Sequence, residues 1–182
     1  LISSGKKAFE IAKASGAVSG KETPFADVPA VKDEYTTPHE ENPFKVSSTE
    51  QIDLLVNSTE QMKKLGSSRS SGRLDFWDTE KWFCSSQGHE IFQNIIESGG
   101  GISSLSVGDG ETQIRSYPQS FGEYRTGGWE VIKSFEFGNH TQRLAEESQR
   151  LLVAPQCPEG TMDLILEFYP TQLHALLIRG FV

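Results

Sequence analysis

The chain has 182 residues and a formal net charge of −8, and 36% of its residues are hydrophobic and 23% charged. This composition is typical of a globular protein, and no uninterrupted run of about 18 apolar residues is present to cross a membrane. An acidic surface repels phosphate backbones, so we expect neither nucleic acid nor a membrane as a partner. Cys84 and Cys157 have no C-x-x-C spacing, which indicates reduced thiols and a cytoplasmic location.

The sequence opens with a helical pattern that is followed by an extended segment. Residues 4–15 have apolar side chains at helical spacing and stop at Gly16, so we expect residues 1–16 to be the terminal helix of a preceding unit. Residues 17–46 contain four prolines and no sustained hydrophobic period, which predicts an extended connector. The side chains expected to anchor this connector on the protein surface are Phe25, Val28, Tyr35 and Phe44.

The strongest helical pattern covers residues 48–65 and opens a predicted domain at 47–160. Ser47 with Glu50 three residues later forms a capping-box pattern. Gly66 follows two lysines and suits the left-handed conformation that ends many helices. The apolar stripe expected to face the core consists of Ile52, Leu55, Val56, Thr59 and Met62.

The pattern then changes to a period near two, which predicts strands. After a serine-rich break at 67–71, the segments 73–77, 82–84, 89–96, 102–107 and 112–117 read as short strands, with polar turns at 78–81 and 85–88. Gly108-Asp109-Gly110 predicts a tight hairpin. These segments predict a meander of about five antiparallel strands with one apolar face.

The last part of the chain returns to a helical pattern. Residues 129–137 read as a strand or an irregular aromatic segment, and 141–154 read as a helix with Leu144, Ser148, Leu151 and Leu152 on its apolar side. Glu146 and Arg150 have the spacing of a helical ion pair. A turn at 157–160 and a strand at 162–168 follow. Because strands are grouped rather than alternating with helices, the predicted fold class is α+β, an antiparallel multi-stranded sheet with flanking helices.

No catalytic or metal-binding motif is complete in the residues themselves. His39-Glu40 begins like a zinc-binding helix, but no second histidine follows one turn later. No serine lies in a G-x-S-x-G elbow, and Cys84 reads as a small core residue. His89, His140 and His174 read as structural, and the carboxylate pairs Glu40/Glu41 and Glu146/Glu147 read as solvated. We therefore predict no catalytic residue and no metal ligand in this chain, and the pattern identifies no substrate-binding residue.

A set of segments taken together is more specific than any single motif. In chain order they are Asn42-Pro43-Phe44, Phe83-Cys84-Ser85-Ser86-Gln87-Gly88, Arg115-Ser116-Tyr117-Pro118, Gly127-Gly128-Trp129-Glu130 and Pro158-Glu159-Gly160-Thr161-Met162-Asp163-Leu164-Ile165-Leu166. With the helices around them, these segments resemble the TldD/PmbA family over residues 5–178. That family, formerly labelled modulators of DNA gyrase, consists of zinc-dependent peptidases of the bacterial and archaeal cytoplasm.

The resemblance implies which part of such a peptidase this chain represents. In the family, the strand after the P-x-G turn leads into a helix with H-E-x-x-x-H, whose histidines bind zinc. Here Arg179 and Gly180 stand where the first His and the Glu would fall, and neither can ligate zinc or act as a base. Residues 161–182 then read as the truncated start of a catalytic-type domain. Either the end of the sequence has drifted, or the chain was cut at a domain border.

Two functions follow as expectations. The first is the N-terminal-side portion of a TldD/PmbA-like zinc peptidase, an incomplete fragment of a larger two-domain protein, which contributes to a homo- or heterodimer and to the passage of unfolded peptide. Zinc is then expected in the full-length family member and no cofactor in this chain. The alternative is a non-catalytic binding or assembly module that pairs with an intact homologue. A DNA-associated regulator, suggested by the older family label, conflicts with the charge of −8.

Overall fold

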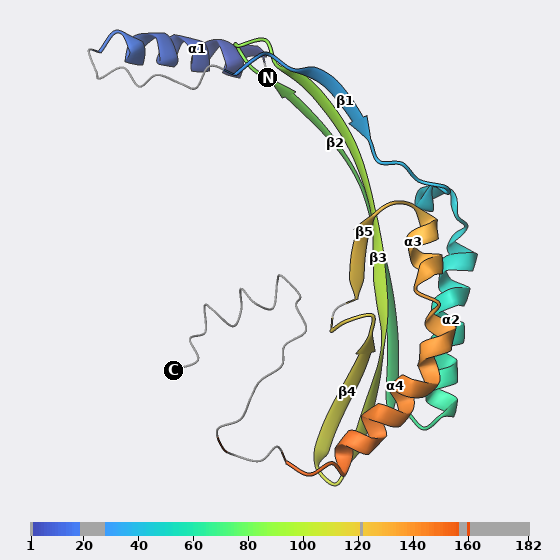
Figure 1. Ribbon diagram of the computed structural model, residues 1–182. Helices are drawn as coiled ribbons and strands as arrows, with labels where there is room; N and C mark the ends of the chain where they lie inside the picture. The colour runs from blue at the N-terminus through green and yellow to red at the C-terminus, as the bar shows by residue number, and fades with distance from the viewer. Residues whose placement is uncertain (1, 19–27, 121, 157–159, 161–182) are drawn as a thin grey trace.

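The computed structural model describes residues 2–18, 28–120, 122–156 and 160. These residues form an α+β fold in which helices pack against one face of a curved five-stranded sheet (Figure 1). The predicted fold class is thus confirmed, with one difference: β1 runs parallel to its neighbour, so the sheet is mixed. Some of the predictions fall outside the described residues. They concern the strand at 162–168, Phe25, His174, Arg179 and Gly180.

The elements follow one another in a simple order along the chain. They are α1 (Ile2–Gly16), β1 (Lys32–Thr36), the short 3-10 helix Pro43–Lys45, α2 (Ser48–Lys64), β2 (Arg69–Cys84), β3 (Glu90–Gly108), β4 (Glu111–Tyr117), β5 (Glu123–Thr126), α3 (Trp129–Ser134) and α4 (Phe137–Leu152). The predicted first helix is confirmed as α1, and none of its described residues is buried.

Two long strands, β2 and β3, replace the four short ones predicted between residues 73 and 107. Their antiparallel register is continuous from Arg69 opposite Leu105 to Cys84 opposite Glu90. The predicted turn at 78–81 is therefore wrong. Both faces of the ribbon are exposed at that point, so polar side chains are accommodated without leaving the strand. The turn at 85–88 is confirmed, because Gly88 N–H donates to Ser85 O at 3.1 Å.

The other edge of β3 is shared by three strands placed end to end. β1 pairs with residues 90–94, β5 with residues 97–100 and β4 with residues 102–108. The predicted hairpin between β3 and β4 is confirmed, with positive φ at Asp109 (47°) and Gly110 (80°), as a tight two-residue turn requires.

The segment before α2 is held by main-chain pairing at β1 and by apolar side chains close to α2, where Pro43 and Val46 are buried. β1 adds to the sheet, and Thr37 N–H extends the pairing to Asn94 O at 2.9 Å. Of the side chains predicted to anchor it, Val28 and Tyr35 are exposed, whereas Phe44, although half exposed, packs edge-on against Phe76 with 6.3 Å between ring centroids. The prediction is wrong for Val28 and Tyr35, because backbone groups of an extended segment can bind a sheet edge without burying side chains.

Helix α2 begins and ends as predicted but is rotated about its axis. Glu50 N–H donates to the Ser47 hydroxyl at 3.2 Å, and Gly66 has φ +99°. Met62 is fully buried, whereas Ile52 and Val56 are 57% and 42% exposed. Those two were wrongly assigned to the core, because α2 packs on both β2 and α4 and these neighbours select the adjacent face.

The aromatic segment after β5 is helical, contrary to prediction. α3 occupies residues 129–134, and its start is fixed by Trp129 N–H, which donates to Glu41 O at 2.8 Å. α4 begins at Phe137, earlier than predicted, and buries Leu144 and Ser148 as expected. Its predicted Glu146–Arg150 pairing is replaced by a bond from Gln142 Nε2 to Glu146 Oε1 at 2.8 Å.

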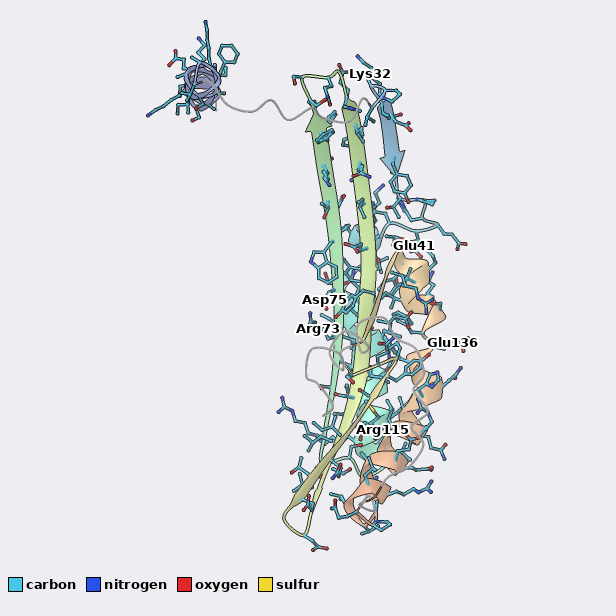
Figure 2. The ribbon with its side chains drawn as sticks, turned by 60° about the vertical axis from the view of Figure 1, so that its left-hand side comes forward. Lys32, Glu41, Arg73, Asp75, Arg115 and Glu136 are labelled. Atoms are coloured by element: carbon cyan, nitrogen blue, oxygen red, sulfur yellow. The ribbon has the colours of Figure 1, made fainter. Side chains whose placement is uncertain are left out.

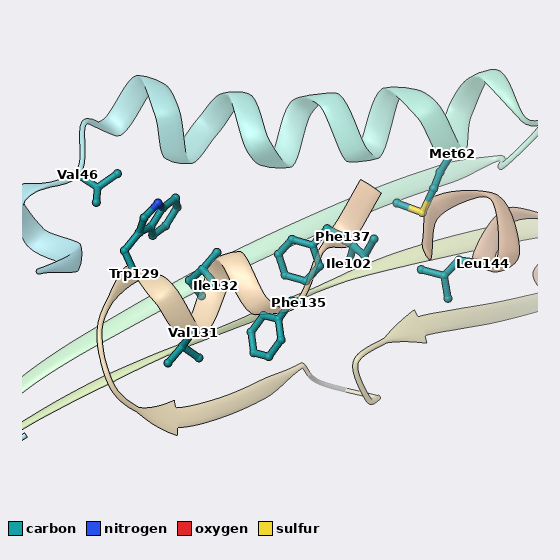
Figure 3. Packing of buried hydrophobic residues seen from close by; sticks show 9 residues of the cluster. All are labelled: Val46, Met62, Ile102, Trp129, Val131, Ile132, Phe135, Phe137 and Leu144. Carbon is teal, nitrogen blue, oxygen red and sulfur yellow. The ribbon is translucent and has the colours of Figure 1, made fainter. Parts of the chain in front are cut away.

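The core lies between these helices and the lower half of the sheet (Figure 3). It consists of Val46, Met62, Ile102, Trp129, Val131, Ile132, Phe135, Phe137 and Leu144. In Figure 1, the upper halves of β2 and β3 extend beyond the helices, with β1 beside them. The fold therefore combines a packed base with a projecting ribbon.

Candidate functional site

The histidines considered as metal ligands lie apart and have local partners. His39 Nδ1 is 3.1 Å from Thr37 O, and His89 Nδ1 accepts the Val31 N–H at 3.1 Å. The His140 ring stacks on Tyr117 with 3.6 Å between centroids. Within residues 2–18, 28–120, 122–156 and 160, no three His, Cys, Asp or Glu side chains converge to hold a metal ion.

The remaining candidates are likewise dispersed. Cys84 is exposed at the end of β2, so its prediction as a core residue is wrong; the ribbon there projects beyond α2, α3 and α4 (Figure 1). Glu41 pairs with Lys133 at 2.7 Å, and Glu147 pairs with Arg115 at 2.9 Å. These carboxylates stabilise contacts between elements and do not converge on one site.

The feature that stands out is the outer edge of β2. Among the described residues, β2 pairs with β3 alone, although it is 16 residues long. In an antiparallel pair, alternate residues direct their N–H and C=O groups toward the partner and the others direct them away. A strand of this length therefore presents a row of outward main-chain groups.

The hydrogen bonds identify which residues of β2 face outward. Ser85 N–H donates to His89 O at 3.1 Å, and the β2–β3 register continues from that pair without a bulge. Odd-numbered residues of β2 therefore bond to β3, and even-numbered residues face the free edge. On β3, the Ile96 and Asn94 carbonyls accept from Gly127 and Thr37 on the opposite side, which agrees with this assignment.

The distal part of this edge, residues 77–84, is the accessible part. All eight residues are exposed, and Figure 2 shows the ribbon projecting past the helices. The outward groups here belong to Asp78, Glu80, Trp82 and Cys84. We call this segment the distal edge.

Side chains of the distal edge differ between the two faces of the sheet. One face of the distal edge continues the face on which the helices pack nearer the base of the sheet. There, Asp78 accepts a hydrogen bond from Asn94 Nδ2 at 2.6 Å. The Trp82 and Phe92 rings also pack there, with 4.3 Å between their centroids. Glu80 lies between Asp78 and Trp82 and is exposed. On the opposite face, which we call the open face, Trp77 contacts Tyr124 at 5.4 Å between centroids.

A polar cluster continues the open face below Trp77. The Tyr124 hydroxyl donates to Asp75 Oδ2 at 3.0 Å, and Arg73 Nε donates to the same oxygen. Burial first, and then the Asp75 hydrogen bond, raise the pKa of Tyr124. Figure 2 shows Arg73 and Asp75 side by side on this part of the sheet. Gly99 makes room for the cluster, because a Cβ there would lie 1.9 Å from the Tyr124 ring.

Beside this cluster lies a cavity of about 330 Å³. Its lining includes the hydroxyls of Ser71, Ser103, Ser116 and Ser120 and the amide of Gln119. Ser71 and Ser103 are already bonded to each other at 2.8 Å. The open face thus offers hydrogen-bonding groups next to the β2 edge, and no sequence motif marks these serines.

Comparison with known proteins adds no relative: no family model matches the chain, and no curated protein matches it. Among the described residues, none of the helices has the length and apolar character needed to cross a membrane. What the chain does must therefore be argued from its residues and geometry.

Proposed function

We propose that this chain is the non-catalytic, N-terminal-side portion of a TldD/PmbA-like zinc-dependent peptidase of the cytoplasm, and that it receives extended peptide along the distal edge. The observation that carries the proposal is the exposed edge of β2, which pairs with no strand other than β3 within the described part of the chain. The peptidase part of the proposal rests on the resemblance of the sequence to the TldD/PmbA family. Zinc and the catalytic residues belong to the full-length family member, and this chain contributes no cofactor ligand.

Strand addition suits a substrate that is an unfolded peptide. An extended peptide that joins a sheet edge is held through main-chain hydrogen bonds, which do not depend on its sequence. Four outward residues of the distal edge supply four N–H and four C=O groups in a row. Such an edge can hold many different peptides while they move toward a catalytic centre.

Dimer formation is the second part of the proposal. Ile52 and Val56 lie one turn apart on α2 and are both largely exposed, so they form an apolar strip that a homologous subunit can cover. Replacing Ile52 with Glu should shift the chain toward monomer in sedimentation velocity, whereas the exposed Asp53→Asn change on the same helix should leave the distribution unchanged. An identical distribution for Ile52→Glu would contradict this part.

The alternative, a binding or assembly module that acts on an intact homologue, uses the same edge. Arg179 and Gly180 stand where the family has the first His and the Glu of its zinc motif. Their presence supports this alternative, because neither side chain can serve in a zinc site. Adding the chain to a zinc-loaded homologue distinguishes the two: a change in the homologue's peptidase rate supports the module.

The edge itself is tested with proline. Glu80→Pro removes an outward N–H that β3 does not use, whereas Glu80→Thr removes the same charge and keeps the N–H. Using a fluorescein-labelled neutral, extended peptide and anisotropy, we expect Glu80→Pro to weaken binding at least about tenfold and Glu80→Thr to change it little. That factor corresponds to the loss of one or two hydrogen bonds. Equal binding by both variants would refute strand addition at this edge.

Catalysis provides an independent check. The purified 182-residue chain should hold no stoichiometric zinc and hydrolyse no peptide, as measured by metal analysis and by mass spectrometry of the incubated peptide. One tightly bound zinc per chain would contradict the proposal that the metal ligands lie outside this chain.

A further inference from the structure

We propose that the distal edge selects basic peptides, namely extended segments with Lys or Arg at every second position and apolar residues between them. This inference rests on the proposed function, because it assigns the substrate class of the same edge. Two properties of the molecule support it: the alternation of side chains along β2 and the charge of the strands around them.

Alternation places an acidic pair and an aromatic ring on one face of the edge. Asp78, Glu80 and Trp82 have even numbers and share the face that carries the helices lower down. A strand added beside them presents every second side chain to this face. The Cβ atom of each such residue lies about 5 Å from the Cβ atom of the residue opposite it on β2. Lysine or arginine there meets two carboxylates and the face of an exposed indole, which attracts cations.

The open face of the same edge has a different character. Trp77, Thr79, Lys81 and Phe83 point to this side, and Trp77 and Phe83 are 44% and 48% exposed. The alternate side chains of an added strand therefore lie beside two aromatic rings and one lysine. Apolar residues fit beside the two rings, and Lys81 disfavours a further cation by like-charge repulsion. The edge thus favours a peptide in which basic and apolar residues alternate.

The surrounding strands reinforce the preference for a cationic partner. Across β1 and residues 77–84 and 90–97, two lysines face six carboxylates, a net charge of −4. Lys32 is already paired with Glu90 at 2.9 Å, so half of the local positive charge is engaged. A neutral or acidic peptide gains nothing from this field, whereas a basic peptide is attracted to it.

The test compares three peptides that differ only in charge. The basic peptide is acetyl-Thr-Lys-Val-Lys-Val-Lys-Thr-amide, and its companions carry Gln or Glu in place of every Lys. We expect the Lys peptide to bind about tenfold more tightly than the Gln peptide at 50 mM salt, which matches two exposed ion pairs of ordinary strength. The Glu peptide should bind more weakly than both.

Variants assign the effect to the edge. Glu80→Gln and Asp78→Asn should each reduce the preference for the Lys peptide about threefold, while binding of the Gln peptide stays constant. Asp53→Asn, the same charge change on α2, is the matched control and should leave the preference intact. Circular dichroism confirms that each variant is folded.

The outcomes separate the inference from the proposed function. If all three peptides bind equally, or if Asp53→Asn lowers the preference as much as Glu80→Gln, the basic selectivity is wrong and strand addition stands. If no peptide binds while the chain is folded, the proposed function fails, and the selectivity fails with it.

Discussion

A buried serine network between the sheet and α4 allows the packing to be tested quantitatively. The Ser104 hydroxyl, on β3, lies 2.6 Å from the Ser67 hydroxyl and 2.9 Å from the Ser148 hydroxyl. Ser148 also bonds to Ser106 at 2.9 Å. All four side chains are buried, so water cannot replace a hydrogen bond that is lost.

The change Ser104→Ala removes the centre of this network. The Ser67 hydroxyl then loses its partner on β3, whereas Ser148 keeps its bonds to Ser106 and to Ala145 O at 3.0 Å. Leaving one buried hydroxyl unpaired costs about 1–3 kcal/mol. We therefore expect the free energy of unfolding to fall by that amount and the melting temperature to fall by about 2–4 °C for each kcal/mol.

Two neighbouring serines serve as matched controls. Ser103 bonds to Ser71 on the open face, where both are in contact with solvent, so Ser103→Ala should change the stability by less than about 0.5 kcal/mol. The buried Ser70 hydroxyl has no hydrogen-bond partner within the described part of the chain, so Ser70→Ala should be neutral or stabilising. Urea unfolding measures all three. A Ser104→Ala cost no larger than that of Ser103→Ala would refute this account.

Three further predictions concern the backbone and pH. Gly99→Ala should lower the free energy of unfolding by about 1–3 kcal/mol, because its Cβ would strike Tyr124, whereas Gly138→Ala, with open space around it, should raise it by up to about 1 kcal/mol; thermal melts compare them. Lys81→Pro should destabilise more than Glu80→Pro in urea unfolding, because only Lys81 bonds to β3 through its N–H; equal costs would show that the register is misassigned. Burial, and next Arg143, lower the pKa of His140, so the folded state favours the neutral ring and its contribution to stability is lost as pH falls below the unfolded value of about 6.5. Urea unfolding at pH 7.5 and 5 should therefore show a larger loss for the native chain than for His140→Phe, and equal losses would contradict the assignment.

Local signals in the sequence were sufficient for the helix ends and the hairpin. Ser47 and Glu50 define the start of α2, Gly66 defines its end, and Asp109-Gly110 defines the turn between β3 and β4. Each of these depends on side chains within a few residues of one another. Fold class followed from the grouping of strands and helices, which is also a local property of the pattern.

Long-range pairing accounts for the features that the sequence did not reveal. The polar residues 78–81 read as a turn because their partner, residues 93–96 of β3, lies on another strand. Gly99 falls between the predicted strands 89–96 and 102–107, yet it lies within β3, where the Tyr124 ring occupies the space that a Cβ would need. β1 pairs in parallel with residues 90–94, which lie far from it in the sequence. The free edge of β2 is likewise a property of the strand order, so no motif could announce it.

The charge on the distal edge also bears on self-association, since exposed edges invite pairing between copies. A second β2 that pairs antiparallel here brings Asp78 and Glu80 near like charges, which disfavours the pair. A basic peptide is attracted by the same two side chains. These acidic side chains can therefore keep the edge open to substrate and closed to its own copy.

Salt separates these two effects, because the Debye screening length falls from about 10 Å at 0.1 M to about 3 Å at 1 M. Raising the salt weakens the attraction of the basic peptide and also relieves the repulsion between two acidic edges. We expect the affinity for the Lys peptide to fall as salt is raised from about 0.05 to about 1 M, because the attraction is screened. Edge-mediated dimerisation of the Ile52→Glu chain should rise over the same range. Anisotropy and sedimentation velocity in the same buffers measure both, with Glu80→Thr flattening each trend. If both affinities fall together, the acidic side chains of β2 do not distinguish substrate from self.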